Sequence, residues 1–226
     1  MGKSMIRPER CEINRYLGYR SITPDDTVNS LIDECISEAE KVIRPAYAVK
    51  YLDVCAVDED ILKIGGLVVH SHGLYRNMEH CQTTAMFAAT IGHGVDMLIR
   101  RAEIGSLLKA SVLQAVGAAY VEALCDEVNE DIKRKAEEKG CSCAARFSPG
   151  YGDLSLELQK DFERILSMRQ QLGITLTDSL LMVPSKSVTA FVGIRKGKCS
   201  TAETAVNKCK DCDLYRDCSY SKEVRQ

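Results

Sequence analysis

The chain has 226 residues, 45% of them hydrophobic, and a formal net charge of −2. This length allows one domain with a proper core, alone or with an appendage. Dispersed Lys and Arg under a negative net charge argue against a surface that binds nucleic acid. No apolar run approaches the ~20 residues that span a bilayer, and the first ten residues lack a signal-peptide apolar region. We therefore expect a cytoplasmic protein that binds neither nucleic acid nor membrane.

The first predicted element is a helix that begins at Thr23-Pro24-Asp25-Asp26, where proline and acidic residues suit the first turn. Apolar residues then recur at helical spacing from Val28 to Ala39. Three apolar or β-branched runs follow and predict strands over 47–54, 61–70 and 85–91. Gly65-Gly66 inside the second run predicts a bulge or a sharp bend.

The second half begins with a helical pattern over 95–139 that is interrupted near Gly105-Ser106. Its apolar residues between Leu113 and Ile132 recur every three or four positions and predict one buried stripe. Ser155 begins another helix that Gly173 ends, and 188–194 alternates as a strand. Strands and helices mix without regular βαβ repeats, which favours an α+β fold with helices packed around an antiparallel sheet.

A binding turn is predicted at Arg146-Phe147-Ser148-Pro149-Gly150-Tyr151-Gly152. Proline fixes one φ angle and the two glycines permit positive φ, so backbone amides can be left facing a ligand. The arginine offers a planar fork for a carboxylate, and the tyrosine offers an aromatic face and a hydroxyl. A structural turn with a surface arginine is the competing interpretation.

This turn resembles the S-adenosylmethionine-binding segment in the activation domain of cobalamin-dependent methionine synthase. Further segments are similar to that family in the same order: 12–19, 88–92, 113–122, Thr177-Asp178-Ser179 and Met182-Val183-Pro184. The resemblance covers residues up to about 195. We therefore expect one activation-like domain over 1–195, with a curved, mainly antiparallel sheet edged by helices, and a cysteine-rich tail over 196–226.

The resemblance implies that S-adenosylmethionine contacts Arg146, the backbone of Ser148, Pro149 and Gly150, Tyr151, and a helical glutamate that aligns with Glu122. Glu122 also stands among the small residues Ala118, Ala119 and Cys125, which leaves room for a ligand. Without the resemblance, an exposed helical glutamate is the better interpretation. Asp153 is expected to cap the next helix, with pairing to the ligand ammonium as the alternative. Thr177-Asp178-Ser179 is expected to bond its own backbone in a turn.

The resemblance also implies that the chemistry belongs to two cofactors. Cob(II)alamin accepts an electron from a flavodoxin-like or ferredoxin-like donor, and the resulting cob(I)alamin takes the methyl group of S-adenosylmethionine. The protein supplies proximity and alignment, so no catalytic residue is assigned. The chain lacks the family's Asp-x-His-x-x-Gly cobalt-ligating motif. The cobalamin is therefore expected on a partner, which is a methionine synthase without its own activation domain.

Two other functions remain open. In the first of these functions, the partner is another corrinoid methyltransferase. In the second, the chain is a non-catalytic regulatory protein that binds S-adenosylmethionine or metal and steers the conformation of a corrinoid protein.

Four cysteines, Cys199, Cys209, Cys212 and Cys218, crowd into the tail. Four thiolates can enclose tetrahedral zinc or hold an iron–sulfur cluster, and a cluster suits a reductive activator slightly better. A reduced tail without metal is the alternative. Cys141-Ser142-Cys143 predicts exposed loop thiols, with a redox pair or metal donor as the alternative. Cys35, Cys55, Cys81 and Cys125 are expected to be buried, and His70 and His72 to be ordinary histidines near the end of a strand.

Overall fold

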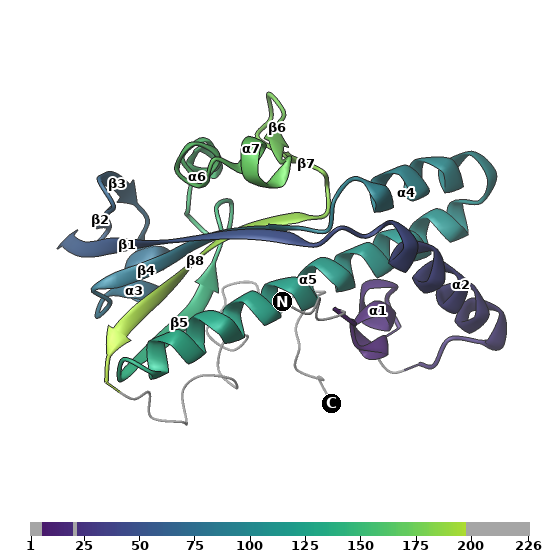
Figure 1. The fold of residues 1–226 in the computed structure, drawn as a ribbon, viewed down its shortest axis with the longest axis horizontal. Helices are drawn as coiled ribbons and strands as arrows, with labels where there is room; N and C mark the ends of the chain where they lie inside the picture. Colours follow the sequence, from purple (N-terminus) through teal and green to yellow (C-terminus); the bar gives the residue numbers. More distant parts are fainter. Residues whose placement is uncertain (1–5, 20–21, 198–226) are drawn as a thin grey trace.

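A six-stranded antiparallel sheet forms the centre of the protein in the computed structural model, which describes residues 6–19 and 22–197 (Figure 1). The strands are β1 (Ala46–Asp58), β2 (Ile61–Ile64), β3 (Leu67–His70), β4 (Thr83–Thr90), β5 (Cys141–Phe147) and β8 (Ser187–Lys196). Their order in the sheet is β3-β2-β1-β4-β8-β5, with every neighbouring pair antiparallel. This confirms the predicted α+β class with an antiparallel sheet.

Helices cover both faces of this sheet. One side carries α1 (Arg10–Tyr16), α2 (Asp26–Val42), α4 (Gly94–Gly105) and the long α5 (Leu107–Glu137). The other side carries α3 (His72–Met78), η1 (Leu156–Leu158), α6 (Gln159–Leu166), α7 (Met168–Leu172) and the small ribbon of β6 (Thr175–Leu176) and β7 (Met182–Val183). In Figure 1, α5 runs below the sheet, and α6 and α7 lie above it.

Two apolar cores follow from strand alternation, since successive side chains point to opposite faces. In β4, Phe87 packs into the core on the α5 side and Met86 into the core on the α6 side. In β8, Ala190 and Val192 face α5, with Val188 and Ile194 packed against the same core. The predicted alternation over 188–194 is confirmed, because these four residues share one face.

Two predicted helix boundaries agree with the structure. Asp25 accepts a hydrogen bond from the Val28 amide at 2.8 Å and begins α2. Ser106 accepts one from the Lys109 amide at 3.2 Å and separates α4 from α5. By length and composition α5 could cross a membrane, but 56% of its most apolar stretch is buried in the protein. Its apolar stripe is therefore that of a core helix.

Several local predictions were wrong or incomplete. The run 61–70 is a hairpin, because Gly65 and Gly66 turn the chain with φ angles of 54° and 92°. The helix expected after Ser155 is interrupted at Ser167, whose φ is 48°. Cys55 is exposed, since it lies on a strand face that α5 leaves open, whereas Cys35, Cys81 and Cys125 are buried as expected.

Two segments were assigned to the wrong kind of element. Cys141 and Cys143 lie in β5 and are partly covered, so they are not exposed loop thiols. Burial raises the pKa of Cys143 to about 11. His70 ends β3, but His72 begins α3, because Ser71 accepts a hydrogen bond from the Leu74 amide at 3.0 Å and caps that helix.

Candidate functional site

Arg146 points towards α5 because β5 contains a bulge. From Cys143 to Arg146 the chain advances three residues, while the partner β8 advances two, from Ile194 to Val192. One extra residue in a strand shifts the alternation of all later side chains to the opposite face. Arg146 is thereby directed to α5, and the next residue, Phe147, packs on the α6 side. The sequence pattern carries no sign of this bulge.

The guanidinium of Arg146 meets two carboxylates of α5. Its Nη2 lies 3.0 Å from Glu122 Oε2 and 3.0 Å from Asp126 Oδ1. The Arg146 side chain is 24% exposed, against 38% for Glu122 and 61% for Asp126. Its Nη1 is buried and has no hydrogen-bond partner. One nitrogen of the fork is therefore held by the protein, while the other has an unsatisfied donor.

Helix geometry explains why two acids meet one arginine. Residues four apart lie on the same helix face, so Asp126 stands one turn beyond Glu122. Glu122 is predicted from the sequence but Asp126 is not, although the four-residue spacing of these two acids indicates that they share a helix face. The small neighbours of Glu122 were expected to leave an open surface for a ligand. Two of them, Ala119 and Cys125, are instead buried in the core. Burial also raises the pKa of Cys125 to about 12.

Helix α1 borders the site. Burial raises the pKa of Tyr16, and the nearby carboxylate of Glu122 raises it further. The Arg15 guanidinium lies 4.5 Å from the centre of the Tyr16 ring and forms an ion pair with Glu12 at 2.6 Å. A cation over an aromatic face is favourable. The family resemblance includes residues 12–19, but no pattern in the sequence places this segment beside Glu122.

The turn after β5 uses part of its backbone internally. Gly150 and Gly152 adopt φ angles of 85° and 56°, as expected. The Gly150 amide donates to the Leu154 carbonyl at 2.8 Å, and the Tyr151 amide donates to the Ser148 carbonyl at 3.0 Å. These two amides are therefore bonded within the turn and do not face a ligand. Pro149 is buried.

Tyr151 extends from this turn and is 54% exposed. Its ring packs edge-on against Phe147, with the two ring centres 5.4 Å apart. Edge-to-face contacts of this kind hold an aromatic ring in a defined orientation. The chain therefore presents an oriented aromatic surface a few residues beyond Arg146.

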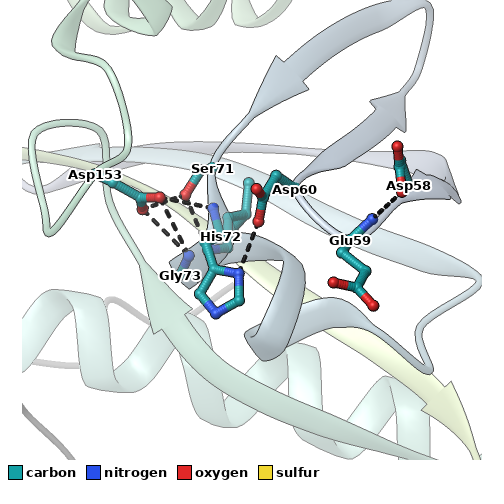
Figure 2. A network of polar contacts seen from close by, with 8 residues as sticks. Asp58, Glu59, Asp60, Ser71, His72, Gly73 and Asp153 are labelled. Atoms are coloured by element: carbon teal, nitrogen blue, oxygen red, sulfur yellow. Dashed lines mark hydrogen bonds and ion pairs between the residues drawn. The ribbon is translucent and has the colours of Figure 1, made fainter.

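Asp153 caps a helix, but not the one that follows it (Figure 2). Its carboxylate accepts hydrogen bonds from the Ser71 hydroxyl at 2.6 Å and from the amides of His72 at 2.6 Å and Gly73 at 3.2 Å. These groups form the start of α3. Burial alone would raise the pKa of Asp153, but these hydrogen bonds outweigh it and lower the pKa. The helix that follows begins instead at Ser155, which accepts from the Glu157 amide.

The segment 177–181 forms a closed turn between β6 and β7. Thr177 Oγ1 lies 3.0 Å from Ser179 Oγ and accepts a hydrogen bond from the Leu181 amide at 3.1 Å. This confirms a turn that bonds its own backbone. The ribbon lies with α6 and α7 (Figure 1), across the sheet from α5, to which Arg146 is bound.

The four tail cysteines, Cys199, Cys209, Cys212 and Cys218, fall outside the residues that the structure describes. Within the described ranges 6–19 and 22–197, no group of three or more His, Cys, Asp or Glu side chains is arranged to hold a metal ion. His72 instead pairs with Asp60, with 2.7 Å between Nδ1 and Oδ1 (Figure 2).

Comparison with known proteins agrees with this fold. A solved structure titled "Crystal Structure of the MetH Reactivation Domain bound to AdoHcy" is 16% identical in sequence and superposes with a TM-score of 0.57, covering 80% of this chain and 74% of that chain. No curated protein matches the sequence. The family described as "Vitamin B12 dependent methionine synthase, activation domain" matches residues 75–211, which is more than half of the chain. The chain therefore belongs to the family of vitamin B12-dependent methionine synthase activation domains.

Proposed function

We propose that this protein reactivates a cobalamin-dependent methionine synthase by binding S-adenosylmethionine and presenting its methyl group to a cobalamin held by a partner protein. The observation that supports this best is Arg146, whose buried Nη1 has no partner while its Nη2 binds Glu122 and Asp126. Nη1 is closed to solvent in this conformation, but a buried donor without an acceptor is costly, which favours a side-chain shift that brings the guanidinium to a ligand carboxylate. The related reactivation domain is bound to AdoHcy, the demethylated form of this ligand.

Glu122 and Tyr151 suit the remaining parts of the ligand. The carboxylate of Glu122 can accept hydrogen bonds from an ammonium group, since its side chain is partly exposed. The exposed ring of Tyr151, held by Phe147, offers a flat surface of the kind that an adenine stacks on. Because the amides of Gly150 and Tyr151 are bonded within the turn, recognition by these two residues rests on the Tyr151 side chain and on carbonyl oxygens.

The proposed chemistry needs little from the protein besides placement. A donor of the flavodoxin or ferredoxin kind reduces cob(II)alamin by one electron. The cobalt electron pair of cob(I)alamin then forms a bond to the methyl carbon, while the sulfur keeps the electrons of the broken bond and becomes a neutral thioether. The products are methylcobalamin and S-adenosylhomocysteine. Orientation and exclusion of competing geometries are the contributions expected of the chain.

The test is a calorimetric titration of the protein with S-adenosylmethionine. We expect saturable binding that Arg146→Ala weakens by about 1.5–3 kcal/mol, the value of a charged hydrogen bond, which is roughly 10- to 150-fold in Kd. Arg164→Ala is the matched control, because that arginine pairs with Asp161 at 2.8 Å on α6. Its removal should leave the affinity unchanged.

A second measurement separates the proposed activity from simple binding. With S-adenosylmethionine, a reductant and an isolated cob(II)alamin protein, the visible spectrum should convert to that of methylcobalamin only when the chain is present. Absence of binding, alone and with the cobalamin protein, would contradict the proposal. Binding without methylcobalamin formation would favour a non-catalytic regulatory protein.

The tail adds a separate proposal, that Cys199, Cys209, Cys212 and Cys218 bind a metal ion or an iron–sulfur cluster. It rests on the sequence, where one Cys-x-x-Cys pair stands between two further cysteines. A cluster there could pass the electron that reduces cob(II)alamin.

A further inference from the structure

We propose that Asp126 makes the Arg146 site selective for a positively charged sulfonium over its neutral demethylated product. The inference rests on the proposed function and names a specificity-determining residue within it. The two ligands share their carboxylate, ammonium and adenosine groups. They differ by one methyl group and by the charge that this methyl group places on sulfur.

The charge balance of the site supports this inference. Two carboxylates, those of Glu122 and Asp126, bind the same nitrogen of a single arginine, which leaves one negative charge in excess. Glu12 and Arg15 of α1, which borders the site, form an ion pair with each other, so this pair adds no net charge. A ligand with one extra positive charge therefore gains Coulomb attraction that a neutral analogue does not.

The position of Asp126 allows it to act on the sulfur. A ligand carboxylate bound at the Arg146 guanidinium holds the sulfur close by, because a short carbon chain joins the two groups in methionine. The Asp126 carboxylate contacts Nη2 of the same guanidinium, and the Asp126 side chain is 61% exposed. Water and salt reduce its attraction, so a unit charge ~7 Å away changes a binding constant by roughly 3- to 10-fold. Such selectivity would favour release of product after each transfer.

The experiment compares two dissociation constants, for S-adenosylmethionine and S-adenosylhomocysteine, in the wild-type protein and in Asp126→Asn. Any loosening of Arg146 affects both ligands equally and cancels in their ratio. We expect wild-type protein to prefer S-adenosylmethionine, and Asp126→Asn to lower that preference by roughly 3- to 10-fold. Raising the salt concentration should reduce the preference in the wild type more than in the variant.

The matched control is Glu127→Gln, since Glu127 is the next acid on α5 but lines a depression beside Tyr47 of β1, away from β5. The ratio of the two dissociation constants in Glu127→Gln should equal that of the wild type. An unchanged ratio in Asp126→Asn, or an equal fall in Glu127→Gln, would overturn the inference while leaving the proposed function standing. If the wild-type protein binds neither ligand, the inference and the proposed function are both overturned. Thermal unfolding of each variant establishes that it is folded.

Discussion

Single side chains of this protein gain their roles from partners that are remote in the sequence. Asp153 reaches back to Ser71, 82 residues earlier, and ties the turn after β5 to the start of α3. Gly73 allows this approach, because a Cβ there would lie 3.0 Å from both Asp153 Oδ1 and the Phe147 ring. The ring of Phe147 in turn supports Tyr151. Asp153 therefore stabilises the turn that follows Arg146.

We expect Asp153→Ala to lower the free energy of unfolding at pH 7 by about 1 kcal/mol, the usual cost of losing a helix cap. Chemical denaturation would measure it. Asp178→Ala, which alters an exposed aspartate in the 177–181 turn, is the control and should change stability little. Equal effects of the two substitutions would show that the cap contributes nothing.

The same carboxylate predicts a pH dependence. The folded pKa of Asp153 is lowered, so its contribution to stability is present above the unfolded pKa of about 3.9 and is lost as pH falls through the folded pKa. The stability difference between the wild type and Asp153→Asn should therefore be constant near neutral pH and shrink below about pH 4. A difference that grows on acidification would give the wrong sign for a lowered pKa.

At the scale of elements, α4 is held close to α2 by a glycine. A Cβ at Gly94 would lie 2.5 Å from the Val42 carbonyl oxygen and 2.6 Å from its Cβ. Backbone atoms cannot move aside as the end of a side chain can. At Gly105, the last residue of the same helix, a Cβ would meet nothing within 4 Å. The two ends of α4 therefore provide a matched pair of positions.

Gly94→Ala should destabilise the protein by about 1–3 kcal/mol through overpacking. Gly105→Ala should be neutral or stabilise it by up to about 1 kcal/mol, because alanine loses less backbone entropy than glycine in a helix. Thermal and chemical unfolding of both variants would measure these changes. Similar values for the pair would mean that α4 shifts freely away from α2.

At the scale of the whole molecule, burial sorts the thiols of the described residues. Cys11 and Cys55 are exposed, whereas Cys35, Cys81 and Cys125 are buried. Burial raises the pKa of Cys35 and Cys81 to about 11 and that of Cys125 to about 12, so few thiolates form at neutral pH. Alkylation of native protein at pH 8, followed by peptide mass spectrometry, should label Cys55 quickly and Cys125 only after unfolding. Rapid native labelling of Cys125 would contradict the packing around α5.

The proposed metal site in the tail makes a prediction for the whole chain. Anaerobically purified protein in which Cys209→Ser is combined with Cys212→Ser should lose the bound metal, measured by elemental analysis and the visible spectrum. Cys55→Ser is the control, since that thiol is exposed on β1 and far from the Cys-x-x-Cys pair in sequence. Full retention of metal in the double variant would exclude these two residues as ligands.

Local patterns in the sequence determined much of the order of elements. Asp25 and Ser106 mark helix boundaries through caps that involve residues only three positions away, and alternation in β8 marks its two faces. The short helices α1 and α3 and the strand β5 carry weak periodicity, and their places depend on packing against α5, β8 and the turn at Asp153. The family resemblance predicts that Glu122 and Arg146 contact one ligand, and the structure joins the two side chains directly at 3.0 Å.

The sequence by itself thus determined the α+β class, the helices and strands with strong periodicity, and the order of motifs that marks the family. Only the tertiary structure decided where the functional side chains point. The β5 bulge turns Arg146 towards α5, Asp126 becomes the second acid on its guanidinium, and Asp153 caps α3 rather than the helix after it. These features depend on strand register and on contacts between distant segments, which local patterns do not encode.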